Sequence, residues 1–264
     1  MKYRRDPPSG GFKMVRILLL LLVLLVVALS SWQARYRSRS WRVPLYVAIY
    51  PIAADDSAVT LRYLADLDAE RFKPIDEFFM REAARYRLGE QEPVKTRLRS
   101  ELHDRPPQRA SAAGTLATAW WSLRLRFWAW RVSGSVNEPE DIRLFVLYHD
   151  PQLTPQVPHS LGLTQGLIGV VYAFASPDMN GSNNVVIAHE LLHTVGASDK
   201  YIPGSDAPRF PDGYGNPKQA PLYPQKTAEI MAGRRMLSPT EWQQADSLGE
   251  VVLGPATALE IRWR

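Results

Sequence analysis

Four stretches of the chain combine apolar and β-branched residues in a way that is typical of strands. Val43–Ile52, Ile142–Tyr148 and Leu167–Phe174 are almost continuously apolar, which indicates strands that are buried on both faces. Val94–Leu102 alternates apolar and polar residues, as a strand with one solvated face does. The pattern therefore predicts a sheet to which all four segments contribute.

Longer amphipathic patterns predict helices between these strands. Asp55–Leu88 carries apolar residues at helical spacing and is interrupted near Pro74. Thr115–Val132 is a second helical stretch, and it contains the tryptophans Trp120, Trp121, Trp128 and Trp130. This helix either lies on a membrane surface or covers the sheet, and we favour the second alternative. The order of elements predicts an α+β (mixed α/β) fold around one sheet.

The N-terminal region has the pattern of a membrane or export segment. Ile17–Leu29 is an unbroken apolar run, and its length lies between that of a signal-peptide core and that of a transmembrane helix. The basic leader, together with Trp32 and Tyr36 at interfacial positions, favours an anchor. Small residues over Ala28–Ser30 would also permit cleavage, so a secreted protein is the alternative.

These features predict the organisation of the whole chain. We expect a basic cytoplasmic leader (1–16), a transmembrane anchor or signal segment (17–32), an Arg/Ser-rich linker (33–42) and one folded domain (43–264). The predicted location is a bacterial inner membrane, crossed once, with the domain facing the periplasm or the exterior.

Charge and cysteine content narrow the possible partners and cofactors. The formal net charge is +5, and the basic excess is concentrated around the apolar run. This distribution indicates contact with anionic lipid headgroups and argues against a nucleic-acid partner. The chain contains no cysteine, so a metal site would have to use histidine and carboxylate ligands.

Residues 183–199 combine histidines and carboxylates at metal-binding spacing. A helix is expected to begin near Asn183 or Asn184 and to end at Gly196. His189 and His193 lie one turn apart on one face of it and can share a metal ion, with Glu190 beside them. The other side chains of this helix are apolar, which indicates that the helix is buried. Two histidines and a glutamate in a buried helix need a partner, such as a metal ion, that offsets the cost of their burial. Gly196 permits a sharp turn that can bring Asp199 back to the same site.

This segment resembles the metzincin signature H-E-x-x-H-x-x-G-x-x-H, with Asp199 in place of the third histidine. The resemblance implies a catalytic domain with a central sheet, an active-site helix and a small C-terminal subdomain. It further implies one catalytic zinc ion held by His189, His193 and Asp199. The implied activity is an endopeptidase in which Glu190 is the general base for a zinc-activated water and the substrate is a peptide or protein.

The resemblance also suggests roles for residues downstream. Metzincins carry a methionine in a tight turn beneath the metal, and Met231 is the candidate here, with Met236 as a weaker one. Ser238–Glu241 has the pattern of a capping box, so a C-terminal helix is expected to start there. The strand Leu167–Phe174 is expected to be the cleft's edge strand, against which an extended substrate would pair.

Several alternatives remain open at this stage. Glu229 competes with Asp199 as the third ligand. The residues that could supply a phenol to the transition state are Tyr201, Tyr214 and Tyr223. The proline-rich segment 201–226 is expected to form a cleft wall or lid, and the histidines expected at the surface are His103, His149 and His159.

The alternative function is a non-catalytic, membrane-anchored zinc-binding envelope protein. Glu190 argues against it, because a purely structural zinc site needs no general base.

Overall fold

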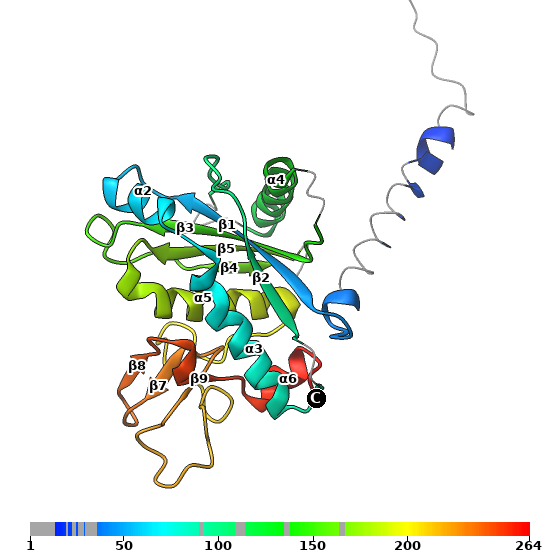
Figure 1. Cartoon of the computed structure of the whole chain (residues 1–264). Coiled ribbons are helices and arrows are strands. Elements are labelled where there is room, and N and C mark those ends of the chain that lie inside the picture. Colours follow the sequence, from blue (N-terminus) through cyan, green and yellow to red (C-terminus); the bar gives the residue numbers. More distant parts are fainter. Residues whose placement is uncertain are drawn as a thin grey trace, which may run out of the picture.

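The chain folds around one five-stranded sheet (Figure 1), which confirms the predicted mixed α/β architecture. The computed structural model describes residues 14–19, 21, 22, 25, 29, 36–89, 92–108, 114–134, 138–163 and 167–264.

The strand order in the sheet is β2-β1-β3-β5-β4. Four strands run parallel: β1 (Leu45–Ala53), β2 (Val94–Leu98), β3 (Ile142–His149) and β5 (Ile168–Phe174). All four were predicted. The short strand β4 (Leu161–Leu163) was not, and it pairs antiparallel with β5. The prediction that β5 is an edge strand is therefore wrong, because β4 occupies its outer side.

Both faces of the sheet are covered, which explains why its strands are apolar almost throughout. Along β1, Leu45, Val47 and Ile49 contribute to one core, and Ala48, Tyr50 and Ile52 contribute to the other. The first core also contains side chains of α2 (Ala58–Ala65), α3 (Lys73–Arg85) and α5 (Asn180–Val195).

The helical region predicted over 55–88 is divided into three pieces. A short 3₁₀ turn, η1 (Ala69–Phe72), separates α2 from α3, and Pro74 lies in the first turn of α3. Proline is tolerated there because the first N–H groups of a helix have no intrahelical acceptor.

The opposite face of the sheet is covered by α4 (Thr115–Ser133), on the far side from α5 (Figure 1). Trp121, Leu125 and Trp128 pack into the second core. The expectation that this helix covers the sheet is therefore confirmed for the face of α4 that carries these three residues.

The chain after α5 forms a small region with little regular structure, on the side of α5 away from the sheet (Figure 1). A parallel pair joins β6 (Ala228–Glu229) to β9 (Val251–Val252), and an antiparallel pair joins β7 (Arg234–Met236) to β8 (Trp242–Gln244). The region also contains the 3₁₀ turn η3 (Leu248–Glu250) and the helix α6 (Pro255–Glu260). Helix α5 is thus enclosed between the sheet and this region.

The helix expected from Ser238 does not form. Ser238 Oγ accepts hydrogen bonds from the backbone N–H groups of Thr240 and Glu241, at 3.4 and 3.1 Å, as a capping residue would. The chain then continues as β8, because pairing with β7 satisfies its backbone groups. The capping pattern therefore forms a tight turn between two strands.

The residues just before β1 pack against the C-terminus. The Trp41 indole lies edge-on to Trp263, with ring centroids 5.2 Å apart, and its Nε1 donates to the carbonyl of Ile261 at 2.7 Å. The end of the predicted linker is therefore part of the folded body.

Residues 1–13 of the predicted leader and much of the segment 17–32, including Ala28 and Ser30, lie outside the described residues. Among the helices that are described, none combines the length and apolar character needed to cross a bilayer.

Candidate metal centre

Helix α5 carries the two histidines and is fixed to the sheet by an asparagine. The Asn183 side chain accepts from the N–H of Phe174 at 3.0 Å and donates to its carbonyl at 2.8 Å. The helix begins at Asn180, three or four residues before the predicted start near Asn183 or Asn184, and Asn183 binds β5 instead of capping the helix. One turn apart on α5, the rings of His189 and His193 have centroids separated by 4.7 Å.

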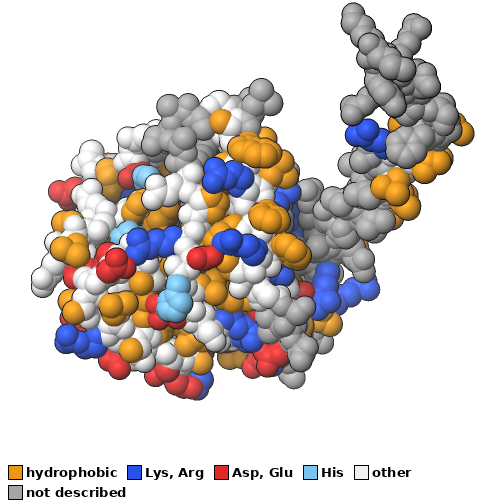
Figure 2. Space-filling model, turned by 90° about the horizontal axis from the view of Figure 1, so that it is seen from above, with side chains coloured by type: hydrophobic (Ala, Val, Ile, Leu, Met, Phe, Trp, Pro, Cys, Tyr) orange, Lys and Arg blue, Asp and Glu red, His pale blue; other side chains and the backbone are white. Residues whose placement is uncertain are grey.

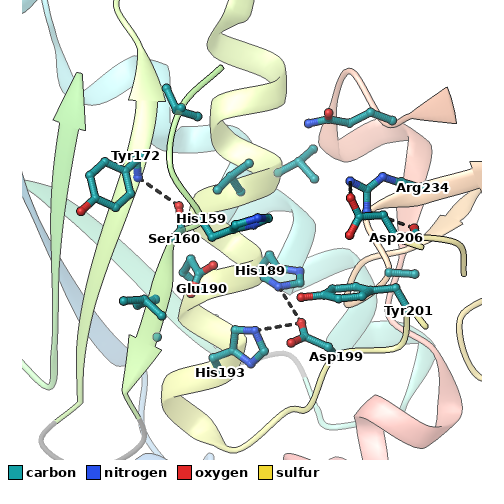
Figure 3. A pocket seen from close by; sticks show the side chains of 18 of the residues that line it. His159, Ser160, Tyr172, His189, Glu190, His193, Asp199, Tyr201, Asp206 and Arg234 are labelled. Carbon is teal, nitrogen blue, oxygen red and sulfur yellow. Dashed lines mark hydrogen bonds and ion pairs between the residues drawn. The ribbon is translucent and has the colours of Figure 1, made fainter. Parts of the chain in front are cut away.

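The end of α5 returns the chain to the histidines. Gly196 has φ 110°, and its N–H donates to the carbonyls of Leu192 and His193. This left-handed conformation is accessible to glycine and costly for other residues. After the turn, Asp199 Oδ1 lies 3.2 Å from His189 Nε2 and 3.1 Å from His193 Nε2 (Figure 3).

Backbone carbonyls fix the orientation of both imidazoles. His189 Nδ1 lies 3.0 Å from the carbonyl of Ile230, and His193 Nδ1 lies 2.9 Å from that of Ala197. Each Nδ1 must carry a proton to make this bond, which leaves the Nε2 lone pair of a neutral ring facing Asp199. Two lone pairs and a carboxylate in such proximity require a positive charge between them, either a proton or a metal ion.

The pKa shifts of His189 and Asp199 both favour the charged form of the side chain. Burial lowers the pKa of His189, but the hydrogen bond to Asp199 and the nearby charge of Glu190 outweigh it, and the net shift is upward. For Asp199 burial raises the pKa, and the two histidines more than reverse this effect, holding it well below its usual range.

The three converging atoms fit a zinc site. Zinc bonds of 2.0–2.2 Å in a tetrahedral arrangement place neighbouring ligand atoms about 3.3 Å apart. The distances of 3.1 and 3.2 Å from Asp199 to the imidazoles are close to this value. His189, Glu190 and His193 also have potential ligand atoms within 4.8 Å of one another. We favour Asp199 as the third ligand because its oxygen lies nearer to both Nε2 atoms.

Glu190 lies on the strand side of the histidines (Figure 3). Its side chain is buried, and Oε2 has no hydrogen-bond partner among the described residues. Burial raises the pKa of Glu190, and the two histidines offset only part of this shift. A buried carboxylate with a raised pKa is suited to exchanging a proton with a molecule bound in the site.

Strand β4 lies directly against α5 because residue 162 is glycine. A Cβ at Gly162 would be 2.5 Å from both the carbonyl oxygen of Glu190 and the Cβ of His193.

We expect Gly162→Ala to lower the free energy of unfolding by ~1–3 kcal/mol, the usual cost of overpacking, in a denaturant titration. At Gly249 an added Cβ meets only Ser247 Oγ, at 3.6 Å, so Gly249→Ala is the control. If both substitutions lowered the free energy of unfolding equally, the close approach of β4 to α5 would not restrict the size of residue 162.

A tight turn at residues 230–232 supports the histidines. Ile230 supplies the carbonyl that binds His189, and the Met231 carbonyl accepts from the N–H of Lys200 at 3.0 Å. Met231 is fully buried in this turn, whereas Met236 lies in β7. The turn is therefore attached both to a candidate ligand and to the residue that follows Asp199.

Glu229 holds this turn and is directed away from the histidines. Its carboxylate accepts from Met231 N at 2.6 Å, Gly254 N at 3.1 Å and Thr257 Oγ1 at 2.7 Å. Burial raises its pKa despite these donors. With its oxygens bonded inside the C-terminal region, Glu229 acts as a structural carboxylate rather than as a third ligand.

An ion pair between a buried lysine and a half-buried glutamate fixes the segment that carries Asp199. Lys200 is 1% exposed, and its Nζ lies 2.8 Å from both carboxylate oxygens of Glu260 in α6. Glu260 also accepts from the N–H and hydroxyl of Ser198, at 2.9 and 2.7 Å. Helix α6 thereby holds the residues on both sides of Asp199.

The site opens into a cavity of about 520 Å³. One wall comes from the segment Val157–Gly162 and Tyr172, and the other from Tyr201, Asp206 and Arg234. Asp206 and Arg234 form an ion pair of 3.1 Å across the cleft from His159 (Figure 3). Because Tyr201 and Asp206 belong to the segment 201–226, that segment supplies part of a cleft wall.

The three candidate tyrosines lie in different places. Tyr201 lines the cavity beside Asp199 (Figure 3), and burial and the charge of Asp199 raise its pKa to about 12. Tyr214 and Tyr223 contact each other, with their hydroxyls 3.0 Å apart, and neither lines this cavity.

The wall formed by β4 was missed in the sequence. His159 is exposed, as expected, and it also lines the cavity, as does Ser160, whose Oγ accepts from the N–H of Tyr172 at 3.0 Å. Leu161-Gly162-Leu163 is too short for a strand pattern to be recognised, so the sequence carries no usable signal for this wall.

Searches with protein-family models and among curated proteins found no match for this chain.

Proposed function

We propose that this chain is a zinc-dependent endopeptidase of metzincin-like type. The observation that carries the proposal is the convergence of His189, His193 and Asp199 at the floor of an open cleft, with the buried carboxylate of Glu190 beside them, whose Oε2 has no hydrogen-bond partner among the described residues. Three protein ligands leave one zinc position for water or substrate. A structural site would be closed and would not need Glu190.

The proposed chemistry divides between the metal and the chain. A zinc ion held by these three residues supplies a Lewis acid that polarises the scissile carbonyl and acidifies water. Glu190 accepts a proton on its carboxylate from the attacking water and delivers it to the leaving amine. The raised pKa of Glu190 suits both steps, because a carboxyl group with a pKa nearer to neutrality can also donate.

Strand β4 is the proposed docking edge for substrate. It pairs with β5 on one side only and lines the cleft through Leu161 and Gly162. An extended peptide can add to such an edge by backbone hydrogen bonds, which bind many sequences alike. The proximity of β4 to α5 would then place the peptide bond next to Glu190.

Tyr201 is the proposed donor to the developing negative charge on the carbonyl oxygen. Its raised pKa keeps the phenol protonated at neutral pH, so it can donate. We expect Tyr201→Phe to retain zinc and to lower kcat by about 10²-fold, as the loss of one such donor does. Steady-state kinetics on a peptide substrate would measure this, with Tyr214→Phe as the control. An unchanged kcat in Tyr201→Phe would exclude this role.

A peptide-library digestion tests the proposed function. The zinc-loaded chain should cleave internal peptide bonds, as detected by mass spectrometry, and a chelator should stop the reaction. Tight zinc binding without any cleavage would instead favour the alternative of a non-catalytic zinc-binding envelope protein.

A further inference from the structure

Helix α4 is apolar on two opposite faces, and the sheet covers only one of them. Its outer face carries four large side chains that are 55–69% exposed. They are Trp120, Leu123, Phe127 and Trp130. Their spacing of three to four residues places them in one stripe along the helix. A stripe of this size exposed on a soluble surface usually marks an interaction site.

The charge of this face is positive. Helix α4 contains arginines at 124, 126 and 131 and no acidic residue. Arg124 borders the apolar stripe, one turn from Trp120 and Phe127, is exposed, and forms no hydrogen bond or ion pair with other described residues. Arg131 pairs with Asp104 at 2.6 Å. Figure 2 looks down on this side of the molecule and shows hydrophobic and basic side chains next to each other.

This composition fits an anionic bilayer surface better than a second copy of the chain. Tryptophan prefers the interface between headgroups and acyl chains, and arginine binds lipid phosphates. In a symmetric dimer the stripe would meet an identical stripe, so Arg124 would face basic side chains with no carboxylate from α4 to neutralise them.

The same chain contains a second apolar element, which is tethered to the first strand of the sheet. The run Ile17–Leu29 joins β1 through residues 30–44, which can span up to about 50 Å when extended. Helix α4 leads into β3, which is parallel to β1 and adjacent to it. The C-terminal end of α4 therefore lies at the end of the sheet where the N-terminal segment enters.

We propose that the outer face of α4 docks on a bilayer surface rich in anionic phospholipid. Trp120, Phe127 and Trp130 enter the interface, and Arg124 binds headgroup phosphate. Docking would hold the body of the protein in a fixed orientation on the membrane. This proposal does not depend on the peptidase activity.

The absence of cysteine allows a site-specific test on the full chain. Leu123→Cys places one nitroxide label on the stripe, and Leu259→Cys places one on α6, where Leu259 is 64% exposed. Each labelled chain would be reconstituted into nanodiscs of phosphatidylcholine alone or with phosphatidylglycerol. Electron paramagnetic resonance would then measure access of a water-soluble nickel chelate to the label.

The label at 123 should be shielded from nickel in discs that contain phosphatidylglycerol, while the label at 259 stays accessible. Arg124→Gln should shift the docked-to-free ratio about fivefold toward the free state, the factor for one basic residue at an anionic surface. Equal access at both positions would overturn the proposal. So would shielding that is unchanged without anionic lipid, or shielding that depends on protein concentration, which would indicate self-association.

Discussion

Glu190→Gln is expected to lower the peptidase rate by at least ~10²-fold, the lower end of the contribution of general acid–base catalysis. Glutamine keeps the size of the side chain but cannot accept a proton at neutral pH. The kcat for a cleavable peptide, measured at saturating zinc, would show the effect.

The variant should still bind zinc, because Glu190 lies on the strand side of the histidines and Asp199 is the proposed third ligand. Its thermal midpoint should equal or exceed that of the wild type, because a neutral group replaces a buried carboxylate whose Oε2 has no hydrogen-bond partner among the described residues. Loss of zinc from Glu190→Gln would instead identify Glu190 as a ligand. Unchanged activity would show that any cleavage comes from another site or from a contaminant.

Asp199→Ala and His193→Ala are expected to weaken zinc binding by more than the ~10–100-fold that is typical when a residue supporting a ligand is lost. Each removes one of three converging ligand atoms, and activity should disappear along with the metal. Competition with a chromogenic chelator would give the zinc affinity of each variant.

Glu229→Gln is the matched control for these two variants. Its carboxylate binds Met231, Gly254 and Thr257, so the substitution should lower the thermal midpoint while the purified folded protein still binds zinc. If Glu229→Gln lost zinc while Asp199→Ala kept it, Glu229 would be the third ligand and the proposed site would be wrong.

The sheet could be predicted from the sequence because its strands are buried on both faces. Val43–Ile52 and Leu167–Phe174 are apolar runs of strand length, and β1 and β5 lie within one residue of them at most boundaries. Strand β4 has only three residues, one of them glycine, so no periodicity could reveal it. Its position depends on a contact with α5 that is distant in sequence.

The spacing of the candidate site could also be anticipated, because it follows from helix geometry and one glycine turn. His189 and His193 are one turn apart, and Gly196 reverses the chain before Asp199. The contacts that support the site could not be anticipated, because they join segments that are distant in the sequence. Nothing local in the sequence indicates that Glu260 holds Lys200 or that Glu229 stabilises the turn at Met231. For the same reason the capping pattern at Ser238 was misleading, because pairing with β7 determined the local structure.

The most direct test of the central claim is a zinc titration of the metal-free full chain, with peptide cleavage and bound zinc followed together. Cleavage is expected to rise with added zinc and to saturate at about one zinc per chain, as for a mononuclear three-ligand site. The Glu190→Gln chain is expected to bind the same amount of zinc with little cleavage. A chain that binds no zinc, or that cleaves equally well without it, would contradict the account.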